Sequence, residues 1–178
     1  GATSVGYQAK ASSDNTMALG GFSTANGDNS VAIGSGAYAN GRRAIAFGTG
    51  AQALGFNTDP IAMGTNAFSD GTSTTAYGGE NKAIGFNATA IGAYSTANGD
   101  NAVAIGADAV ADGKRVVALG VGAESTRDDQ IILGAQSTEL TVANLSGTGS
   151  ALVKANSDGT LSRINLSGAG TAMVVANG

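Results

Sequence analysis

The chain has 178 residues, including 29 glycines and one proline but no cysteine or histidine. Charged residues make up 12% of it and the net charge is −4, so no basic block points to a nucleic-acid partner. Without histidine or cysteine the Ser-His-Asp and Cys-His catalytic arrangements are impossible, and the usual zinc ligands are missing. We therefore expect neither an enzyme nor a bound cofactor or metal.

Glycine recurs at a fixed spacing of fourteen residues along most of the chain, and the residue before it is nearly always large and apolar. The series is Gly6, Gly20, Gly34, Gly48, Gly64, Gly78, Gly92, Gly106, Gly120 and Gly134. A second glycine follows seven residues later, at Gly27, Gly41, Gly55, Gly71, Gly85, Gly99 and Gly113. A fixed period of this kind is typical of a solenoid built from stacked coils.

Each coil contains a predicted strand that ends just before the leading glycine. Large residues stand three positions and one position before this glycine, as in Met17 and Leu19, with alanine between them. The alternation has the period of two that is typical of a strand, and we expect its large side chains to line a buried face. The alanine column is Ala18, Ala32, Ala46, Ala62, Ala76, Ala90, Ala104 and Ala118.

A second predicted strand follows the glycine and carries small residues at alternate positions, as in Ser23 and Ala25. The coil then closes through Asn-Gly or Asp-Gly pairs, such as Asn26-Gly27, from which we expect a positive φ. Two short strands in each coil predict two parallel sheets packed face to face, a flat all-β roll with coils about 4.8 Å apart.

One interval breaks the period, because Gly48 and Gly64 are sixteen residues apart. The two extra residues fall around Thr58 and Asp59, beside the only proline, Pro60. An insertion at a turn leaves both strands in phase, so we expect an outward bulge and an uninterrupted stack.

A single thin roll buries few large side chains, so its stability as one chain is marginal. A solvent-facing position would not require alanine in eight consecutive coils. We therefore predict that the alanine column, Ala18 to Ala118, packs against neighbouring chains of a homo-oligomer; an exposed and inert column is the alternative. One turn column holds Asp14, Asp28, Arg42, Asp100, Lys114 and Asp128, with signs that alternate at Asp28/Arg42 and at Asp100/Lys114/Asp128, and the next holds Asn15, Asn29, Arg43, Asn57, Asn87, Asn101 and Arg115. We expect these columns to form ladders along the roll or ion pairs between chains.

A further column lies four residues after the leading glycine and alternates with the small residues, so we expect it to face water. It includes Tyr38, Phe68 and Lys82, which would be suitable contacts for an extended protein ligand. A tolerant solvent-exposed face is the alternative for this column.

The segments 29–34 (NSVAIG) and 101–106 (NAVAIG), together with 23–27 and 95–99 (both STANG), resemble the head repeat of YadA-like trimeric autotransporter adhesins. The resemblance covers about residues 1–139. It implies a left-handed parallel β-roll, a homotrimer, and display at the outer membrane on the surface of a Gram-negative bacterium. It also implies binding to host extracellular matrix or cells, self-association, and a stalk and membrane anchor that lie outside this sequence.

From about Leu140 the fourteen-residue period stops and a different duplication begins, in which residues 144–153 are echoed by residues 165–174. Short apolar runs, Leu152-Val153 and Met173-Val174-Val175, predict antiparallel strands in a hairpin or β-prism-like connector. We therefore predict two domains, residues 1–139 and 140–178.

Alternatives to adhesion remain at this point. A structural spacer or autoagglutination segment, with no ligand site of its own, would have the same repeat. Hexapeptide acyltransferases have a period of six and a histidine base, and neither occurs here. Calcium-binding solenoids place aspartates regularly at turns, whereas Asp128-Asp129 is the only adjacent acidic pair. Ice binding is disfavoured because no Thr-x-Thr column repeats.

Overall fold

The structure, a computed structural model, describes residues 1–55, 59–135, 152–155 and 161–164. These residues form strands and turns, and none of them is helical. The chain divides into two units, Gly1–Thr138 and Glu139–Gly178. None of the described residues belongs to a helix that is long and apolar enough to cross a membrane.

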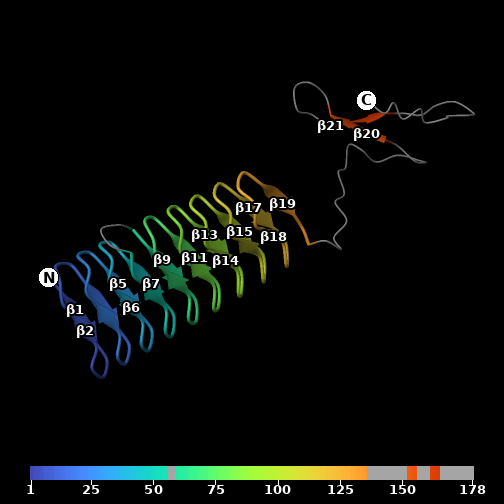
Figure 1. The fold of residues 1–178 in the computed structure, drawn as a ribbon. Coiled ribbons are helices and arrows are strands. Elements are labelled where there is room, and N and C mark those ends of the chain that lie inside the picture. Colours follow the sequence, from blue (N-terminus) through green and yellow to red (C-terminus); the bar gives the residue numbers. More distant parts are fainter. Residues whose placement is uncertain (56–58, 136–151, 156–160, 165–178) are drawn as a thin grey trace, which may run out of the picture. The chain divides into compact units, whose positions relative to one another are not determined.

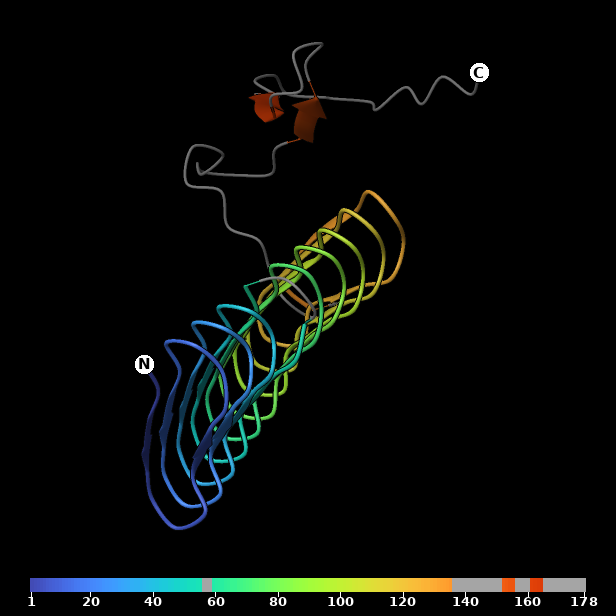
Figure 2. The ribbon, with the colours of Figure 1, turned by 90° about the vertical axis from the view of Figure 1, so that its left-hand side faces the viewer.

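The first unit is a stack of coils in which two parallel sheets face each other (Figures 1 and 2). The ten-stranded sheet consists of β1 (Thr3–Val5), β3 (Met17–Leu19), β5 (Val31–Ile33), β7 (Ile45–Phe47), β9 (Ile61–Met63), β11 (Thr75–Tyr77), β13 (Thr89–Ile91), β15 (Val103–Ile105), β17 (Val117–Leu119) and β19 (Ile131–Leu133). The nine-stranded sheet consists of β2 (Lys10–Ala11), β4 (Thr24–Ala25), β6 (Tyr38–Ala39), β8 (Gln52–Ala53), β10 (Phe68–Ser69), β12 (Lys82–Ala83), β14 (Thr96–Ala97), β16 (Val110–Ala111) and β18 (Glu124–Ser125). The predicted all-β parallel roll is confirmed.

Successive coils pair residue for residue, so equivalent positions form straight columns along the stack. Ala90, for example, pairs with Ala76 on one side and Ala104 on the other. The sixteen-residue coil keeps this register, because Ile45 pairs with Ile61 and the Ile45 amide donates to the Pro60 carbonyl over 3.0 Å. The stack is therefore uninterrupted, as predicted. The bulge was expected around Thr58 and Asp59, and Thr58 lies outside the described residues.

The interior of the roll is filled by small side chains. All eight residues of the alanine column, Ala18, Ala32, Ala46, Ala62, Ala76, Ala90, Ala104 and Ala118, are completely buried within a single chain. A side chain with no exposed surface cannot touch another molecule. The prediction that this column forms the contact between chains is therefore wrong.

The prediction that the large side chains line the interior is wrong as well, since Met17 and Leu19 point outward and are more than 40% exposed. The reason is the thinness of the roll: Val116 is the largest completely buried side chain among the described residues. Two sheets joined by such short turns approach too closely for leucine or phenylalanine to fit between them. The small residue of each alternating triplet must face inward, and the large ones are left outside.

Glycine is required at the leading position for two reasons, and Gly34 illustrates both. Its φ is 128°, a value that side chains rarely permit, and a Cβ would lie 2.5 Å from the Gly48 carbonyl oxygen of the next coil. The second glycine differs from our expectation. Gly27 does not have a positive φ; that conformation occurs two residues later, at Asn29. Gly27 is needed because a Cβ would collide with the Gly41 carbonyl.

The second unit contains a described antiparallel pair, β20 (Leu152–Ala155) and β21 (Leu161–Ile164), in which Leu152 pairs with Ile164. Leu152-Val153 was expected to form a strand of this kind. The second predicted run, Met173-Val174-Val175, lies outside the described residues.

Candidate binding surfaces

The outer face of the ten-stranded sheet carries two continuous columns of mostly large apolar side chains. One column is Thr3, Met17, Val31, Ile45, Ile61, Thr75, Thr89, Val103, Val117 and Ile131; the other is Val5, Leu19, Ile33, Phe47, Met63, Tyr77, Ile91, Ile105, Leu119 and Leu133. Ten of these large residues are more than a third exposed, for example Phe47 at 49% and Leu133 at 47%. No residue in either column is charged.

The size of this face sets it apart from ordinary exposed apolar residues. Ten strands about 4.8 Å apart and three residues long give a patch of roughly 45 Å by 10 Å. Soluble monomers rarely expose contiguous apolar patches larger than a few hundred Å², and larger ones mark interaction sites. The alternation of large and small residues in the sequence marked these two columns. Alternation alone does not show which side of the strand faces inward, so the sequence analysis did not place the columns on the surface.

The outer face of the nine-stranded sheet contains the predicted ligand-facing residues. Tyr38, Phe68 and Lys82 lie on β6, β10 and β12, and all three point outward. Tyr38 pairs with Gln52, Gln52 with Phe68, and Phe68 with Lys82, so the four residues form one ladder. Tyr38 and Phe68 are half-buried, while Lys82 is exposed. The structure thus brings the three predicted residues together on one surface.

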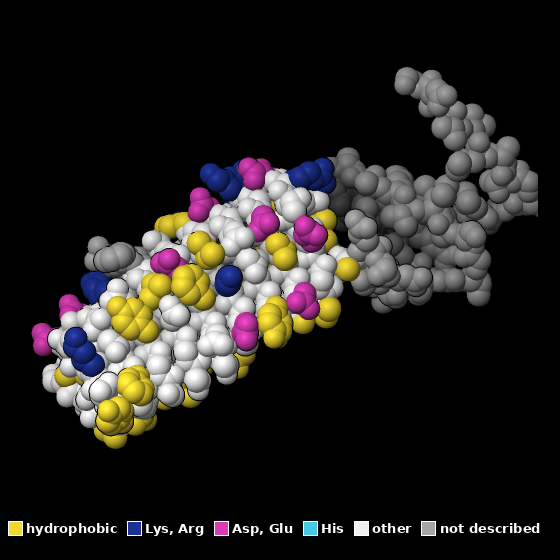
Figure 3. Space-filling model, turned by 60° about the horizontal axis from the view of Figure 1, so that its bottom comes forward, with side chains coloured by type: hydrophobic (Ala, Val, Ile, Leu, Met, Phe, Trp, Pro, Cys, Tyr) yellow, Lys and Arg dark blue, Asp and Glu magenta, His cyan; other side chains and the backbone are white. Residues whose placement is uncertain are grey.

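Two apolar residues that the sequence analysis did not single out extend this ladder. Leu54 and Ile84 follow Gln52 and Lys82 by two positions, so they share the same face of the sheet. Ile84 is 41% exposed and Leu54 is half-buried. The same period of two would have identified them. We call Tyr38, Gln52, Leu54, Phe68, Lys82 and Ile84 the aromatic ladder; Figure 3 shows a face of the roll on which apolar and charged side chains are mixed in this way.

The ring of Tyr38 is held in place by two amides. Its hydroxyl group donates to Asn40 Oδ1 over 3.3 Å and accepts a hydrogen bond from Asn26 Nδ2 over 3.4 Å. Asn26 Nδ2 also lies 3.4 Å from Asn40 Oδ1. These contacts are long, but together they restrict the rotation of an aromatic side chain that would otherwise be free on the surface.

Polar ladders follow the turn that leads into the ten-stranded sheet, as predicted. Asn15 donates to Asn29 and Asn87 to Asn101, both over 3.3 Å. Further along the turns, the Lys114 ammonium group lies 4.0 Å from an Asp100 carboxylate oxygen. These contacts connect successive coils of one chain. They therefore correspond to the predicted ladders along the roll, and not to the alternative of ion pairs between chains.

Two arginine–carboxylate pairs in these turns are bidentate. Arg43 binds Asp59 through both Nε and Nη2, and Arg115 binds Asp129 in the same way. In each pair the hydrogen bond from the guanidinium group lowers the pKa of the carboxyl group below its ordinary value, and the opposite charge adds to this effect. Because all four side chains are about half exposed or more, each pair contributes little at neutral pH.

We expect these two pairs to make the roll less stable in acid. A carboxyl group with a lowered folded pKa contributes stability above its ordinary pKa of about 3.9, and loses it as the pH falls through the lower, folded value. The melting temperature of Asp59→Asn/Asp129→Asn should therefore fall less between pH 5 and pH 2 than that of the parent chain. The matched control is Asp14→Asn, an exposed turn aspartate whose side chain forms no ion pair within the described residues. An equal acid response in all three chains would contradict the expectation.

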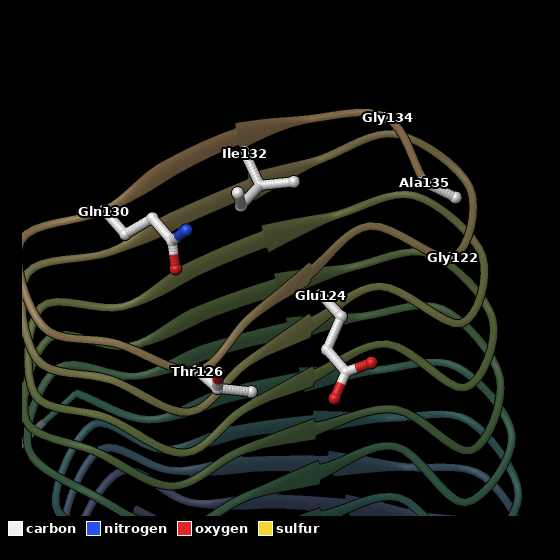
Figure 4. A pocket seen from close by; sticks show the side chains of 7 residues that line it. All are labelled: Gly122, Glu124, Thr126, Gln130, Ile132, Gly134 and Ala135. Carbon is white, nitrogen blue, oxygen red and sulfur yellow. The ribbon is translucent and has the colours of Figure 1, made fainter. Parts of the chain in front are cut away.

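A hollow of about 870 Å³ lies beside the last described coil. Glu124, Thr126, Gln130 and Ile132 contribute side chains to its wall (Figure 4). Among the described residues of that wall, Glu124 is the only titratable one. Within the described residues, no three acidic side chains come together in a way that could hold a metal ion.

A sequence profile of the YadA head domain repeat matches this chain along almost the whole roll. The matched segments are residues 1–23, 11–37, 25–51, 39–57, 61–81, 83–109 and 97–123. The chain belongs to the YadA head domain repeat family. Its fourteen-residue coils, which place a glycine after every strand of the ten-stranded sheet, are thus the head repeat of this family.

The fold of this YadA-like head is also found in a solved structure, the collagen-binding domain of the Yersinia adhesin YadA. The two are 23% identical, with a TM-score of 0.53, and the match covers 85% of this chain and 83% of the other. This similarity establishes a shared architecture. No curated protein matches the sequence of the chain.

Proposed function

We propose that this YadA-like head is a homotrimeric adhesion module on the surface of a Gram-negative bacterium. In this proposal, it attaches the cell to host extracellular matrix or host cells and promotes self-association between bacteria. Contact with the outer membrane would be made through a membrane anchor and not through the roll. The single observation that carries the proposal is the apolar outer face of the ten-stranded sheet, which continues through ten coils and has the size of an interaction site.

The partner that best fits this face is a second copy of the chain. The apolar columns continue through ten coils, and a partner that covers all of them must repeat at the same pitch of about 4.8 Å. Another copy of the same roll meets this requirement without any adjustment. Membership of the head-repeat family favours three copies, so the ten-stranded sheets would turn toward a common axis and the nine-stranded sheets would face outward.

With this arrangement the aromatic ladder is presented to ligands three times per assembly. Tyr38 and Phe68 are two coils apart, about 9.6 Å, which is close to the rise of about 9.3 Å for three residues of a polyproline II helix. The amide of Gln52 lies between them and can bond the free carbonyl groups of such a chain. A collagen-like ligand, of the kind named for the Yersinia domain, therefore suits the ladder, and three copies would add avidity to weak single contacts.

The oligomer is tested by sedimentation equilibrium or native mass spectrometry of the purified chain. We expect a mass three times that of the 17.1 kDa chain. Charge introduced into the apolar face by Leu119→Glu should dissociate the trimer, whereas Glu124→Gln on the opposite sheet should leave it intact. A stable monomer at micromolar concentration would contradict the proposal.

The ligand face is tested with the double variant Tyr38→Ser/Phe68→Ser. If the aromatic ladder binds matrix, this variant should reduce adhesion to immobilised collagen, fibronectin or laminin about tenfold or more, since two central aromatic contacts are lost. The mass and the melting temperature of the trimer should hardly change. Phe86→Ser/Tyr94→Ser, which removes two exposed aromatic residues from turns outside the ladder, is the matched control.

A structural spacer that contributes only to autoagglutination is the second candidate, because the repetitive polar turns and small interior need no ligand to explain them. It differs from the first in one measurable way: the parent trimer would bind none of the three immobilised matrix proteins.

A further inference from the structure

The repetition that favours a second copy also creates a problem of register. Neighbouring strands of the ten-stranded sheet present the same kinds of side chain at the same positions, as Val103 pairs with Val117 and Ile105 with Leu119. A copy displaced by one coil, about 4.8 Å, would therefore meet nearly the same apolar surface. If the copies are to bind in a single axial alignment, the interface needs at least one feature that does not repeat from coil to coil.

Two coils near the middle of the face interrupt the apolar columns. Thr75 on β11 and Thr89 on β13 are paired neighbours, in a column that otherwise holds valine, isoleucine or methionine apart from a threonine in the first coil. Tyr77, in the second column of β11, adds a phenol group and is 55% exposed. Their hydroxyl groups form no hydrogen bond within the described part of the chain.

The shape of the face changes at the same level. A hollow of about 380 Å³ lies over Met63, between the projecting rings of Phe47 and Tyr77, and the glycines at positions 48, 64 and 78 form part of its wall. The polar cluster and this hollow thus occupy adjacent coils, and no other pair of neighbouring strands in the described face carries two threonines and a tyrosine.

We propose that Thr75, Thr89 and Tyr77 fix the axial register between copies of this chain. The proposal rests on the trimer proposed above. When the copies are level, all of these hydroxyl groups lie within two coil heights of one another, where they can bond each other or shared water. When one copy is displaced, hydroxyl groups meet the apolar side chains on either side, and a buried hydroxyl group without a partner is costly. A single polar position in a repetitive coiled-coil interface specifies register for the same reason.

The register can be measured by disulfide cross-linking, because the chain has no cysteine of its own. Three single-cysteine variants place the thiol in one column of successive coils: Ile91→Cys, Ile105→Cys and Leu119→Cys. Pairs of variants are unfolded together, refolded and oxidised, and the cross-linked species are counted. In the parent background we expect one pairing to exceed its neighbours by about tenfold or more, as the loss of hydroxyl bonding in a displaced copy requires.

Removal of the polar cluster should release the register without removing the trimer. In Thr75→Val/Thr89→Val/Tyr77→Phe the native mass should be unchanged, and cross-links should spread over adjacent coils. Valine occupies the equivalent position in β5, β15 and β17, so this variant preserves the shape of the coil. The control Thr24→Val/Thr96→Val makes the same chemical change on the nine-stranded sheet and should keep one dominant pairing.

A relocated cluster completes the test. Val103→Thr/Val117→Thr, added to the variant that lacks the polar cluster, should restore one dominant pairing. The proposal is overturned if that cluster-free variant keeps a single pairing, if the control loses it, or if relocation fails to restore it. The native mass of the parent chain tests the trimer separately. A parent chain that forms no trimer would refute the proposed assembly.

Discussion

Replacement of Gly34 by alanine should be among the most damaging single changes in the roll. Gly34 has a φ of 128°, and a Cβ there would lie 2.5 Å from the Gly48 carbonyl oxygen, which belongs to the backbone of the next coil and cannot move aside. Strain at such a φ costs about 1–3 kcal/mol, and the collision adds to it. We expect a loss of about 3–5 kcal/mol in the free energy of unfolding, measured by urea titration at fixed protein concentration.

The matched control for this change is two residues away. Gly36 has a φ of 66°, but no atom lies within 4 Å of the position that its Cβ would occupy. Gly36→Ala should therefore cost only the strain of a left-handed residue, about 1–2 kcal/mol. Similar losses in the two variants would show that conformation alone, and not the close approach of adjacent coils, accounts for the leading glycine.

Replacement of Ala104 by leucine should also destabilise the chain strongly. Ala104 is completely buried between the sheets and pairs with Ala90 and Ala118, which are equally buried. Among the described residues no completely buried side chain is larger than valine, so three additional carbon atoms have no space. Overpacking of a tight core typically costs about 1–3 kcal/mol, and we expect a loss of about 3 kcal/mol or more in the free energy of unfolding.

The neighbouring residue provides the control, because Ile105 has the opposite orientation. Ile105→Leu keeps the side-chain volume on the outer face and should change the free energy of unfolding by less than about 1.5 kcal/mol. Native mass spectrometry distinguishes the two possible locations of the alanine column. If alanine lay between chains, Ala104→Leu would weaken the assembly at low concentration and leave the folding of each chain unaffected.

The architecture of the roll could be predicted from the sequence because its signals are local and repeated. The spacing from Gly20 to Gly34 fixes the length of a coil, and the alternation Met17-Ala18-Leu19 identifies a strand. If one coil paired out of register, the glycines of all later coils would no longer lie above one another. The strict repetition of glycine therefore specifies parallel, in-register pairing. The sequence also placed Tyr38, Phe68 and Lys82 on one outer face, since they share a position in the repeat.

The orientation of the strands in the ten-stranded sheet could not be obtained in this way. An alternation of large and small residues shows that the two faces of a strand differ, but the chain alone does not specify which face is inside. That choice depends on the distance between the sheets, which the turns set. With only valine-sized space available, Ala18 and its equivalents must face inward, and the large residues become an exterior surface.

The sequence by itself therefore determined the period, the strands and the stacked parallel sheets, because these follow from hydrogen bonding between identical neighbouring coils. The tertiary structure decided which residues are core and which are surface. It did so because the close approach of two backbones at the glycine turns leaves an interior that admits only small side chains.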